Sequence, residues 1–159
     1  MNDKTDGNIR AIEIEDLLAI KAIIDANQLF PSNMLDEMMS DYFGDENSRD
    51  LWFTYDNGKP LAVAYCAPEK LTEGTWNLYL IAVHPDYQRL GYGTSMLHYV
   101  EEKLAYLGER ILLVETSGLE SFKNTREFYL KCGYEKEARI REFYQAGEDK
   151  IVFRKLLTN

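Results

Sequence analysis

The sequence contains little of what several classes of protein depend on. Only two cysteines, Cys66 and Cys132, occur in 159 residues, and they lack metal-ligand spacing, so we expect two small core side chains, no disulfide framework and no metal. No apolar run approaches the roughly eighteen residues of a membrane span. The first residues are too polar for a signal peptide. These absences favour a cytoplasmic protein without a membrane segment.

Basic residues are also scarce. Eighteen Lys and Arg face 27 Asp and Glu, which gives a net charge of −9. This balance argues against binding to nucleic acid or to an anionic membrane and favours encounter with cationic substrates. The length suits a single domain, which we expect over residues 8–159, with residues 1–7 as a disordered lead.

The first half of the chain predicts a short strand, two helices and a hairpin. An edge strand begins at Ile9, and a helix runs from Leu17 to about Asn27 with Asp16 as its cap. A second helix is expected to begin with Ser32 as its cap. Apolar runs at 51–55 and 61–66, separated by an Asn-Gly turn, predict an antiparallel pair.

The second half alternates strands and helices. Strands are expected at 78–83 and 111–115, and a helix at 122–131. Two final strands should cover about 134–144 and 150–156. Between the first two strands, an apolar stripe of helical period followed by Gly108 as a C-terminal cap predicts a further helix; the stripe comprises Met96, Leu97, Val100, Leu104 and Leu107.

The segment from Val83 to Thr94 joins that strand to that helix through two closely spaced glycines. Such a turn lets backbone amides approach an anion, with the positive end of the helix dipole behind them. A dinucleotide fingerprint would need glycine where Met96 stands, and no Gly-Lys-Ser/Thr of a P-loop follows. We therefore expect a pyrophosphate site of another kind.

Two motifs and the element order resemble one known family. Gln88-x-x-Gly91-x-Gly93 resembles the acetyl-CoA pyrophosphate loop of the GCN5-related N-acetyltransferases, the GNAT family. About forty residues later, the segment from Asn124 through Phe128-Tyr129 to Gly133-Tyr134 is similar to a second family motif. The order β-α-α-β-β-β-α-β-α-β-β is also that of the family. The resemblance covers essentially the whole chain from about residue 8.

The resemblance implies a fold and a binding mode. The fold would be an α/β (α+β) GNAT fold, with a mixed, mostly antiparallel sheet of about seven strands, helices on both faces and a splay between strands 4 and 5. Acetyl-CoA would be the cosubstrate, with its pantetheine arm paired along one strand like an added strand. The residues implied to bind it are Ile81, Ala82, Val83, Gln88, Arg89, Leu90, Gly91, Tyr92, Gly93, Thr94 and Asn124.

The resemblance also places catalytic groups. Tyr129 would lie close to the thioester sulfur and act as general acid, because a phenol can donate to the departing thiolate. Some relatives carry a carboxylate where this chain has Asn77, which could order a water instead. Glu115 is the carboxylate we expect to act as base, ahead of Glu73 and Glu142.

The sequence thus predicts an acetyl-CoA-dependent N-acetyltransferase that acts on a primary amine of a small molecule or peptide by direct transfer. A non-catalytic acetyl-CoA sensor and a transferase of a bulkier acyl group stay open as alternatives, and a homodimer is also open. Several aromatic residues are candidates for lining an acceptor pocket or for the core: Tyr42, Trp52, Trp76, Phe143 and Tyr144.

Overall fold

The structure, a computed structural model, describes residues 8–158. Its strands form a seven-stranded sheet in the order β1-β2-β3-β4-β5-β7-β6. β4 and β5 run parallel, whereas β1–β2, β2–β3, β5–β7 and β6–β7 are antiparallel. The expected mixed, mostly antiparallel sheet is confirmed. The strands are β1 (Ile9–Ala11), β2 (Leu51–Asp56), β3 (Pro60–Pro68), β4 (Thr75–Val83), β5 (Ile111–Ser117), β6 (Glu135–Gln145) and β7 (Glu148–Leu156).

The helices occur between these strands in the expected order. The α-helices are α1 (Leu17–Ala26), α2 (Leu35–Met38), α3 (Ser40–Gly44), α4 (Tyr92–Tyr106) and α5 (Lys123–Lys131). Short 3-10 turns are η2 (Ile14–Asp16), η3 (Ser32–Met34), η4 (Pro85–Tyr87) and η5 (Glu120–Phe122).

The described residues fall into two compact units, residues 8–67 with 80–103 and residues 68–79 with 104–158. β4 and α4 contribute residues to both. The single domain expected over residues 8–159 stays a prediction, and the lead expected at residues 1–7 lies outside the described residues.

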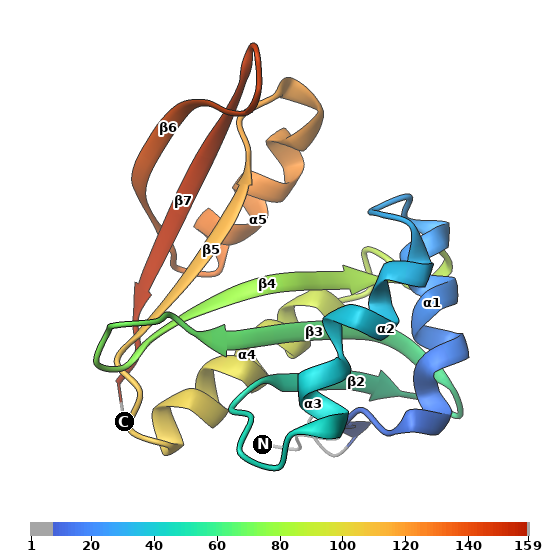
Figure 1. The fold of residues 1–159 in the computed structure, drawn as a ribbon. Helices are drawn as coiled ribbons and strands as arrows, with labels where there is room; N and C mark the ends of the chain where they lie inside the picture. The colour runs from blue at the N-terminus through green and yellow to red at the C-terminus, as the bar shows by residue number, and fades with distance from the viewer. Residues whose placement is uncertain (1–7, 159) are drawn as a thin grey trace. The chain divides into compact units, whose positions relative to one another are not determined.

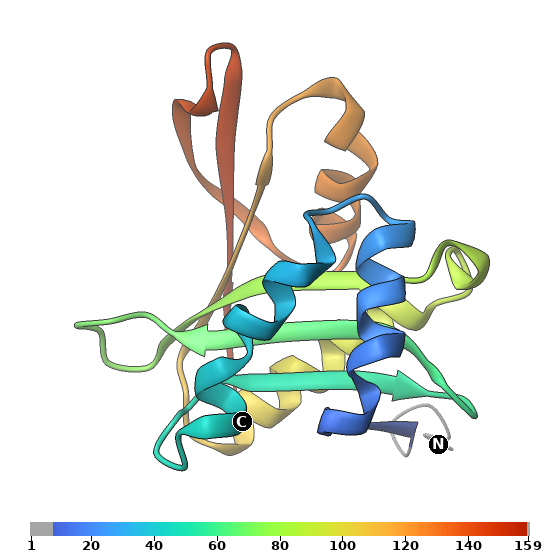
Figure 2. The same cartoon turned by 45° about the vertical axis from the view of Figure 1, so that its right-hand side comes forward.

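The first unit packs helices on both faces of its strands. Trp52 of β2 lies fully buried in a cluster with apolar residues of α1, among them Ile20 and Ile24. Its neighbour Phe53 points the other way, because side chains alternate along a strand, and meets the ring of Tyr99 on α4 at 5.0 Å between centroids. Figures 1 and 2 show α1, α2 and α3 on one side of β2 and β3, with α4 on the other.

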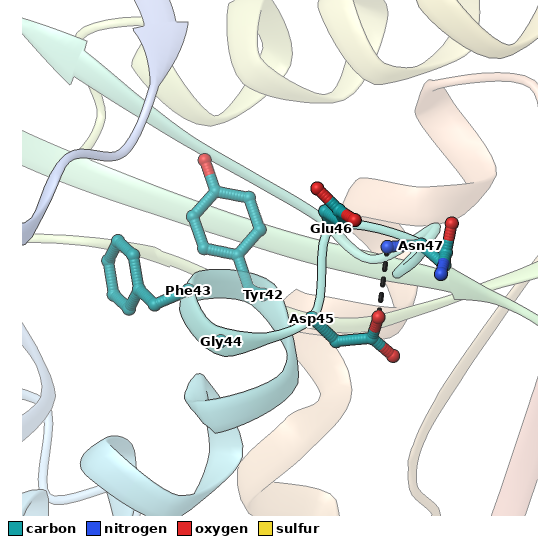
Figure 3. Close-up of a pocket in the computed structure, with 6 residues that line it drawn as sticks. All are labelled: Tyr42, Phe43, Gly44, Asp45, Glu46 and Asn47. Carbon is teal, nitrogen blue, oxygen red and sulfur yellow. Dashed lines mark hydrogen bonds between the residues drawn. The ribbon is translucent and has the colours of Figure 1, made fainter.

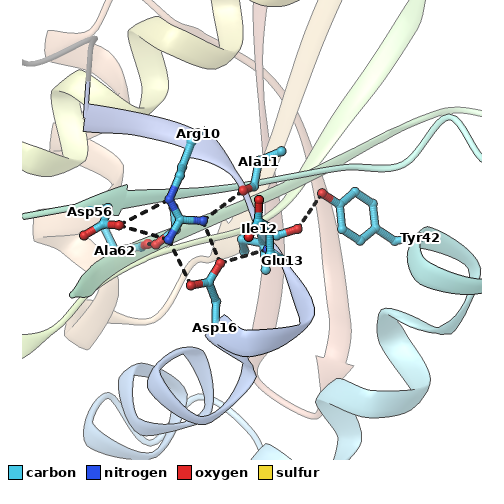
Figure 4. A network of polar contacts seen from close by, with 9 residues as sticks. Arg10, Ala11, Ile12, Glu13, Asp16, Tyr42, Asp56 and Ala62 are labelled. Carbon is cyan, nitrogen blue, oxygen red and sulfur yellow. Dashed lines mark hydrogen bonds and ion pairs between the residues drawn. The ribbon is translucent and has the colours of Figure 1, made fainter. Parts of the chain in front are cut away.

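The start of α1 differs from the expectation. Asp16 makes no side-chain cap bond to α1. Its carboxylate instead accepts hydrogen bonds from both terminal nitrogens of Arg10, at 2.7 and 2.9 Å. It also accepts one from the backbone amide of Glu13 at 2.8 Å (Figure 4). Arg10 also donates to Asp56 at 3.0 Å. The predicted cap is therefore wrong, because a charged partner from β1 takes the carboxylate.

The second predicted helix is also different. It is divided among η3, α2 and α3, with a break at Met39. Ser32 does not cap it, because its hydroxyl donates to Asp25 at 3.0 Å and Pro31 occupies the N-cap position. The apolar side chains of Leu35 and Met39 still reach the core, whereas Met34 is exposed.

In the second unit, α5 packs on the strands through aromatic rings. The buried ring of Tyr129 lies 5.7 Å from Phe153 of β7 and 5.9 Å from Tyr134, between centroids. β6 and β7 form a long hairpin beside β5 (Figure 1). Cys66 of the first unit is a buried core residue as expected, but Cys132 at the end of α5 is only half-buried.

The pairing of β4 with β5 covers only part of both strands. The register runs from Thr75 opposite Ile111 to Leu78 opposite Val114, yet β4 continues to Val83 and β5 to Ser117. The expected splay between these strands is confirmed.

α4 ends at its C-terminus with the glycine cap that the sequence predicted. Gly108 has φ +82° and donates to Ala105, and Glu109 donates to Leu104 at 2.9 Å. These two bonds are those of a Schellman motif, which needs a residue that tolerates positive φ.

Candidate active site

The glycine loop after β4 leaves backbone amides and space available for a ligand. Arg89 and Gly91 both have positive φ, +65° and +92°, and α4 begins at Tyr92. The amide of Ser95 donates to the carbonyl of Gly91 at 3.1 Å. The amides of residues 92–94 precede this bond in the first turn of α4, where a helix offers its N–H groups no carbonyl of its own. A Cβ at Gly91 would meet no atom within 4 Å. Backbone amides in the first turn of a helix are groups that can donate to an anion.

Gln88, one of the predicted cofactor-binding residues, bonds to neighbouring protein groups through its side chain. Its side-chain nitrogen donates to the carbonyl of Val83 and to Oδ1 of Asn27, each at 2.9 Å. Asn27, at the end of α1, donates from its own nitrogen to Val83 and to Ile23, each at 3.0 Å. The two amides therefore hold the loop against the end of β4 and the end of α1.

Other predicted cofactor-binding residues, at the end of β4 and in the loop, differ in exposure. Ala82 is buried and belongs to the apolar core of the first unit, whereas Ile81 and Val83 are half-buried. Arg89 and Leu90 are exposed. The turn before them is ordered by His84, whose Nδ1 accepts from the amide of Asp86 at 3.1 Å.

In the second unit, Glu115 lies in a polar group of three residues. Its Oε2 accepts a hydrogen bond from Nδ2 of Asn77 at 3.0 Å, and its Oε1 lies 3.0 Å from Nζ of Lys150. Asn77 is only 3% exposed, and its Oδ1 has no hydrogen-bond partner among the described residues. Both oxygens of the candidate base are thus held by donors.

Lys150 and Asn27 are the residues that sequence reasoning missed here. Lys150 lies on β7 opposite Ser117, two residues along β5 from Glu115, so it reaches the carboxylate diagonally across the strands. Two charges of opposite sign two positions apart on paired strands would have indicated this contact, had the register been known.

The second motif places one buried and one exposed residue on α5. Tyr129 is 3% exposed, and burial raises the pKa of its hydroxyl well above the usual value, with a smaller contribution from Cys132. The phenol is therefore protonated at neutral pH and can serve as a donor. Asn124 lies in the first turn of α5 and is exposed.

Of the residues predicted to line a pocket for the amine acceptor, some lie in the core and others lie at the surface. Trp52 and Trp76 are buried core residues. Tyr42 is half-buried and donates its hydroxyl to the carbonyl of Ile12 at 2.9 Å. Phe143 and Tyr144 are exposed, at 53% and 44%.

A hollow lies beside Tyr42 in the first unit (Figure 3). It is lined by six consecutive residues, Tyr42 to Asn47. Asp45 in this stretch accepts the amide of Asn47 at 2.9 Å, so the hollow follows the turn after α3. It carries none of the predicted site residues except Tyr42.

Neither a metal-ligand cluster nor a membrane-spanning helix occurs in residues 8–158. Within that range no three His, Cys, Asp or Glu side chains are grouped as metal ligands, and none of the helices there has the length and apolarity to cross a membrane.

Comparison with known proteins connects these features to one family. The family model described as the acetyltransferase (GNAT) domain matches residues 47–136. A search among curated proteins found no match. Among solved structures, a protein of Desulfovibrio desulfuricans described as an acetyltransferase of the GNAT family is 29% identical, with a TM-score of 0.86 over 94% of this chain and 98% of that one.

Two further structures have named activities. The ribosomal-protein-S18-alanine N-acetyltransferase of Escherichia coli is 25% identical, with a TM-score of 0.76 over 95% of this chain and 94% of its own. An aminoglycoside 6′-N-acetyltransferase complexed with coenzyme A is 15% identical, with a TM-score of 0.69 over 95% and 97%, and shows likeness of fold alone. The family resemblance seen in the sequence is confirmed, and the chain belongs to the GNAT family of acetyltransferases.

Proposed function

We propose that this acetyltransferase transfers the acetyl group of acetyl-CoA to a primary amine of a small molecule or peptide. The single observation that carries the proposal is the loop at Gly91, where positive φ, open space and the first amides of α4 would let the backbone donate to a diphosphate. That a relative of the same fold was solved with coenzyme A supports the choice of ligand.

The cosubstrate would be held mainly by backbone. The backbone amides from Arg89 to Thr94 would donate hydrogen bonds to the diphosphate. The backbone from Ile81 to Val83 would pair with the pantetheine arm. Gln88 would act indirectly, since its side chain holds the carbonyl of Val83. Asn124 would contact the pantetheine.

The chemistry requires two proton movements. As the amine nitrogen bonds to the thioester carbon, the carbon–sulfur bond breaks, one amine proton leaves, and the sulfur gains a proton or a hydrogen bond. We assign the donor to Tyr129, whose phenol is protonated at neutral pH and can donate a hydrogen bond to the sulfur. We assign the acceptor to Glu115, acting directly or through a water ordered beside Asn77.

Amine-dependent release of free thiol tests the function. Purified protein would be incubated with acetyl-CoA and a panel of amines. Tyr129→Phe should lower kcat by about a hundredfold or more and leave acetyl-CoA binding intact. Tyr134→Phe is the matched control, because this buried tyrosine belongs to the same aromatic cluster, and its kcat should change little.

Other outcomes would select the alternatives. Tight acetyl-CoA binding without turnover on any amine would favour a sensor, and turnover with succinyl-CoA but not acetyl-CoA would favour a bulkier acyl donor. Failure to bind acetyl-CoA at all would overturn the proposal. We also expect the enzyme to act in the cytoplasm without a nucleic acid or membrane partner, and gel filtration would test for a homodimer.

A further inference from the structure

Lys150 holds its ammonium in a setting suited to a cationic ligand. Its Nζ lies 3.0 Å from Oε1 of Glu115 and 4.0 Å from the centroid of the Phe143 ring. The side chain is only 13% exposed. A carboxylate on one side and an aromatic face on the other are the groups that bind primary ammonium ions in proteins.

A second hydrogen-bond acceptor, Oδ1 of Asn77, lies beside the same carboxylate. Glu115 can only accept from the Asn77 amide, so Nδ2 must face it and the amide cannot be turned round. Oδ1 of Asn77 then has no partner among residues 8–158, although the side chain is almost wholly buried. A buried oxygen of this kind is satisfied when a ligand or water donates an N–H or O–H.

The aromatic side of this setting is reachable from solvent. The pairing of β6 with β7 is irregular between Ile140 and Gln145, and Glu142 in between has φ +53°. The exposed rings of Phe143 and Tyr144 stand perpendicular, with centroids 5.2 Å apart. The pKa of the Tyr144 hydroxyl is raised first by its partial burial and then by the nearby charge of Glu115.

We propose that Glu115 and Phe143 form the subsite for the ammonium of an aliphatic amine acceptor, and that Lys150 occupies this subsite until the acceptor displaces it. The inference rests on the proposed function and names its substrate class. Lys150 presents its charge on an unbranched alkyl arm, so the acceptors expected are slim alkyl primary amines that are cationic at pH 7. Aromatic amines, neutral at that pH, should be poor acceptors. The net charge of −9 favours the same cations.

Binding measured without acetyl-CoA tests the subsite separately from catalysis. The probe is 1,4-diaminobutane, titrated by calorimetry and by NMR, with 1,4-butanediol as the neutral control. Lys150→Met removes the internal competitor and should tighten diamine binding about two- to fivefold, whereas Lys150→Arg should bind like the wild type. Phe143→Leu, a change at an exposed position, should weaken it about two- to fivefold.

A purely structural ion pair gives different results. In that case Lys150→Met would bind the diamine no better than the wild type, and Phe143→Leu would leave binding unchanged; either result overturns the proposal. Equal binding of the diol would also overturn it. If the diamine binds as expected but the protein releases no thiol, only the proposed catalytic function is refuted. If the protein releases thiol but the variants do not change diamine binding as expected, only the subsite is refuted.

Discussion

Asn77 donates from Nδ2 to Oε2 of Glu115 over 3.0 Å and so joins β4 to β5 where their pairing ends. The bond connects Asn77, at the position where the family resemblance implies a carboxylate in some members, to the carboxylate that this chain has on the next strand. The contact therefore joins one carboxylate to one amide, whereas two carboxylates at the same distance would repel each other.

Replacing Asn77 by aspartate tests this relationship. Asn77→Asp would set two carboxylates about 3 Å apart at a buried position, and we expect a loss of about 2–4 kcal/mol of stability at pH 8. The loss should be smaller at pH 5, because the raised pKa of the pair retains a proton there. Urea unfolding at both pH values measures it. The double variant Asn77→Asp/Glu115→Gln, with one carboxylate, should recover most of the stability; no recovery would contradict the account.

The glycine loop allows a matched comparison of two glycines. Gly91 and Gly58 both have φ +92°, and a Cβ at either would meet no atom within 4 Å. Each Gly→Ala change should therefore cost about 1 kcal/mol of stability. Acetyl-CoA binding, followed by calorimetry, should weaken by about tenfold or more only in Gly91→Ala, where backbone must approach the phosphates. Equal binding by both variants would refute the proposed cradle.

Gln88 should act on the loop through the donors of its side chain. In Gln88→Glu a carboxylate replaces the nitrogen that donates to Val83 and Asn27, both of which are acceptors there. We expect a raised KM for acetyl-CoA and a stability change within about 1.5 kcal/mol. Gln145→Glu, at an exposed position on β6, is the control. An unchanged KM in Gln88→Glu would argue against its role in holding the loop.

The Arg10–Asp16 pair should make stability depend on acid pH. The hydrogen bonds from Arg10 hold the pKa of the Asp16 carboxyl below its ordinary value. Such a group contributes stability above its unfolded-state pKa and loses it as the pH falls through the folded pKa. Asp16→Asn should therefore cost about 1–3 kcal/mol at pH 7.

That cost should shrink below about pH 4, near the ordinary carboxyl pKa. Thermal or urea unfolding between pH 7 and 3 measures it. Asp36→Asn, which removes an exposed partner of Lys21, should change stability by less than about 1 kcal/mol at any pH. A cost for Asp16→Asn that does not vary with pH would contradict the assignment.

Local sequence signals predicted the elements and the loop well. The stripe through Met96 and Leu104 and the cap at Gly108 correctly indicated α4, because helix periodicity and positive φ depend on neighbours within one turn. The Asn57-Gly58 turn likewise predicted the hairpin of β2 and β3. The cap positions Asp16 and Ser32 were wrong, because partners at Arg10 and Asp25 competed for their side chains.

The sequence by itself determined the family, the order of elements and the position of the glycine loop between β4 and α4, since these depend on short contiguous motifs. Only the tertiary structure decided what surrounds the candidate base and the loop. Asn77 and Glu115 lie 38 residues apart, and Asn27 and Gln88 lie 61 apart. Strand register and helix packing bring such pairs together, and neither follows from local periodicity. The ammonium of Lys150 on Glu115 is the clearest case, because it depends on the pairing of β5 with β7.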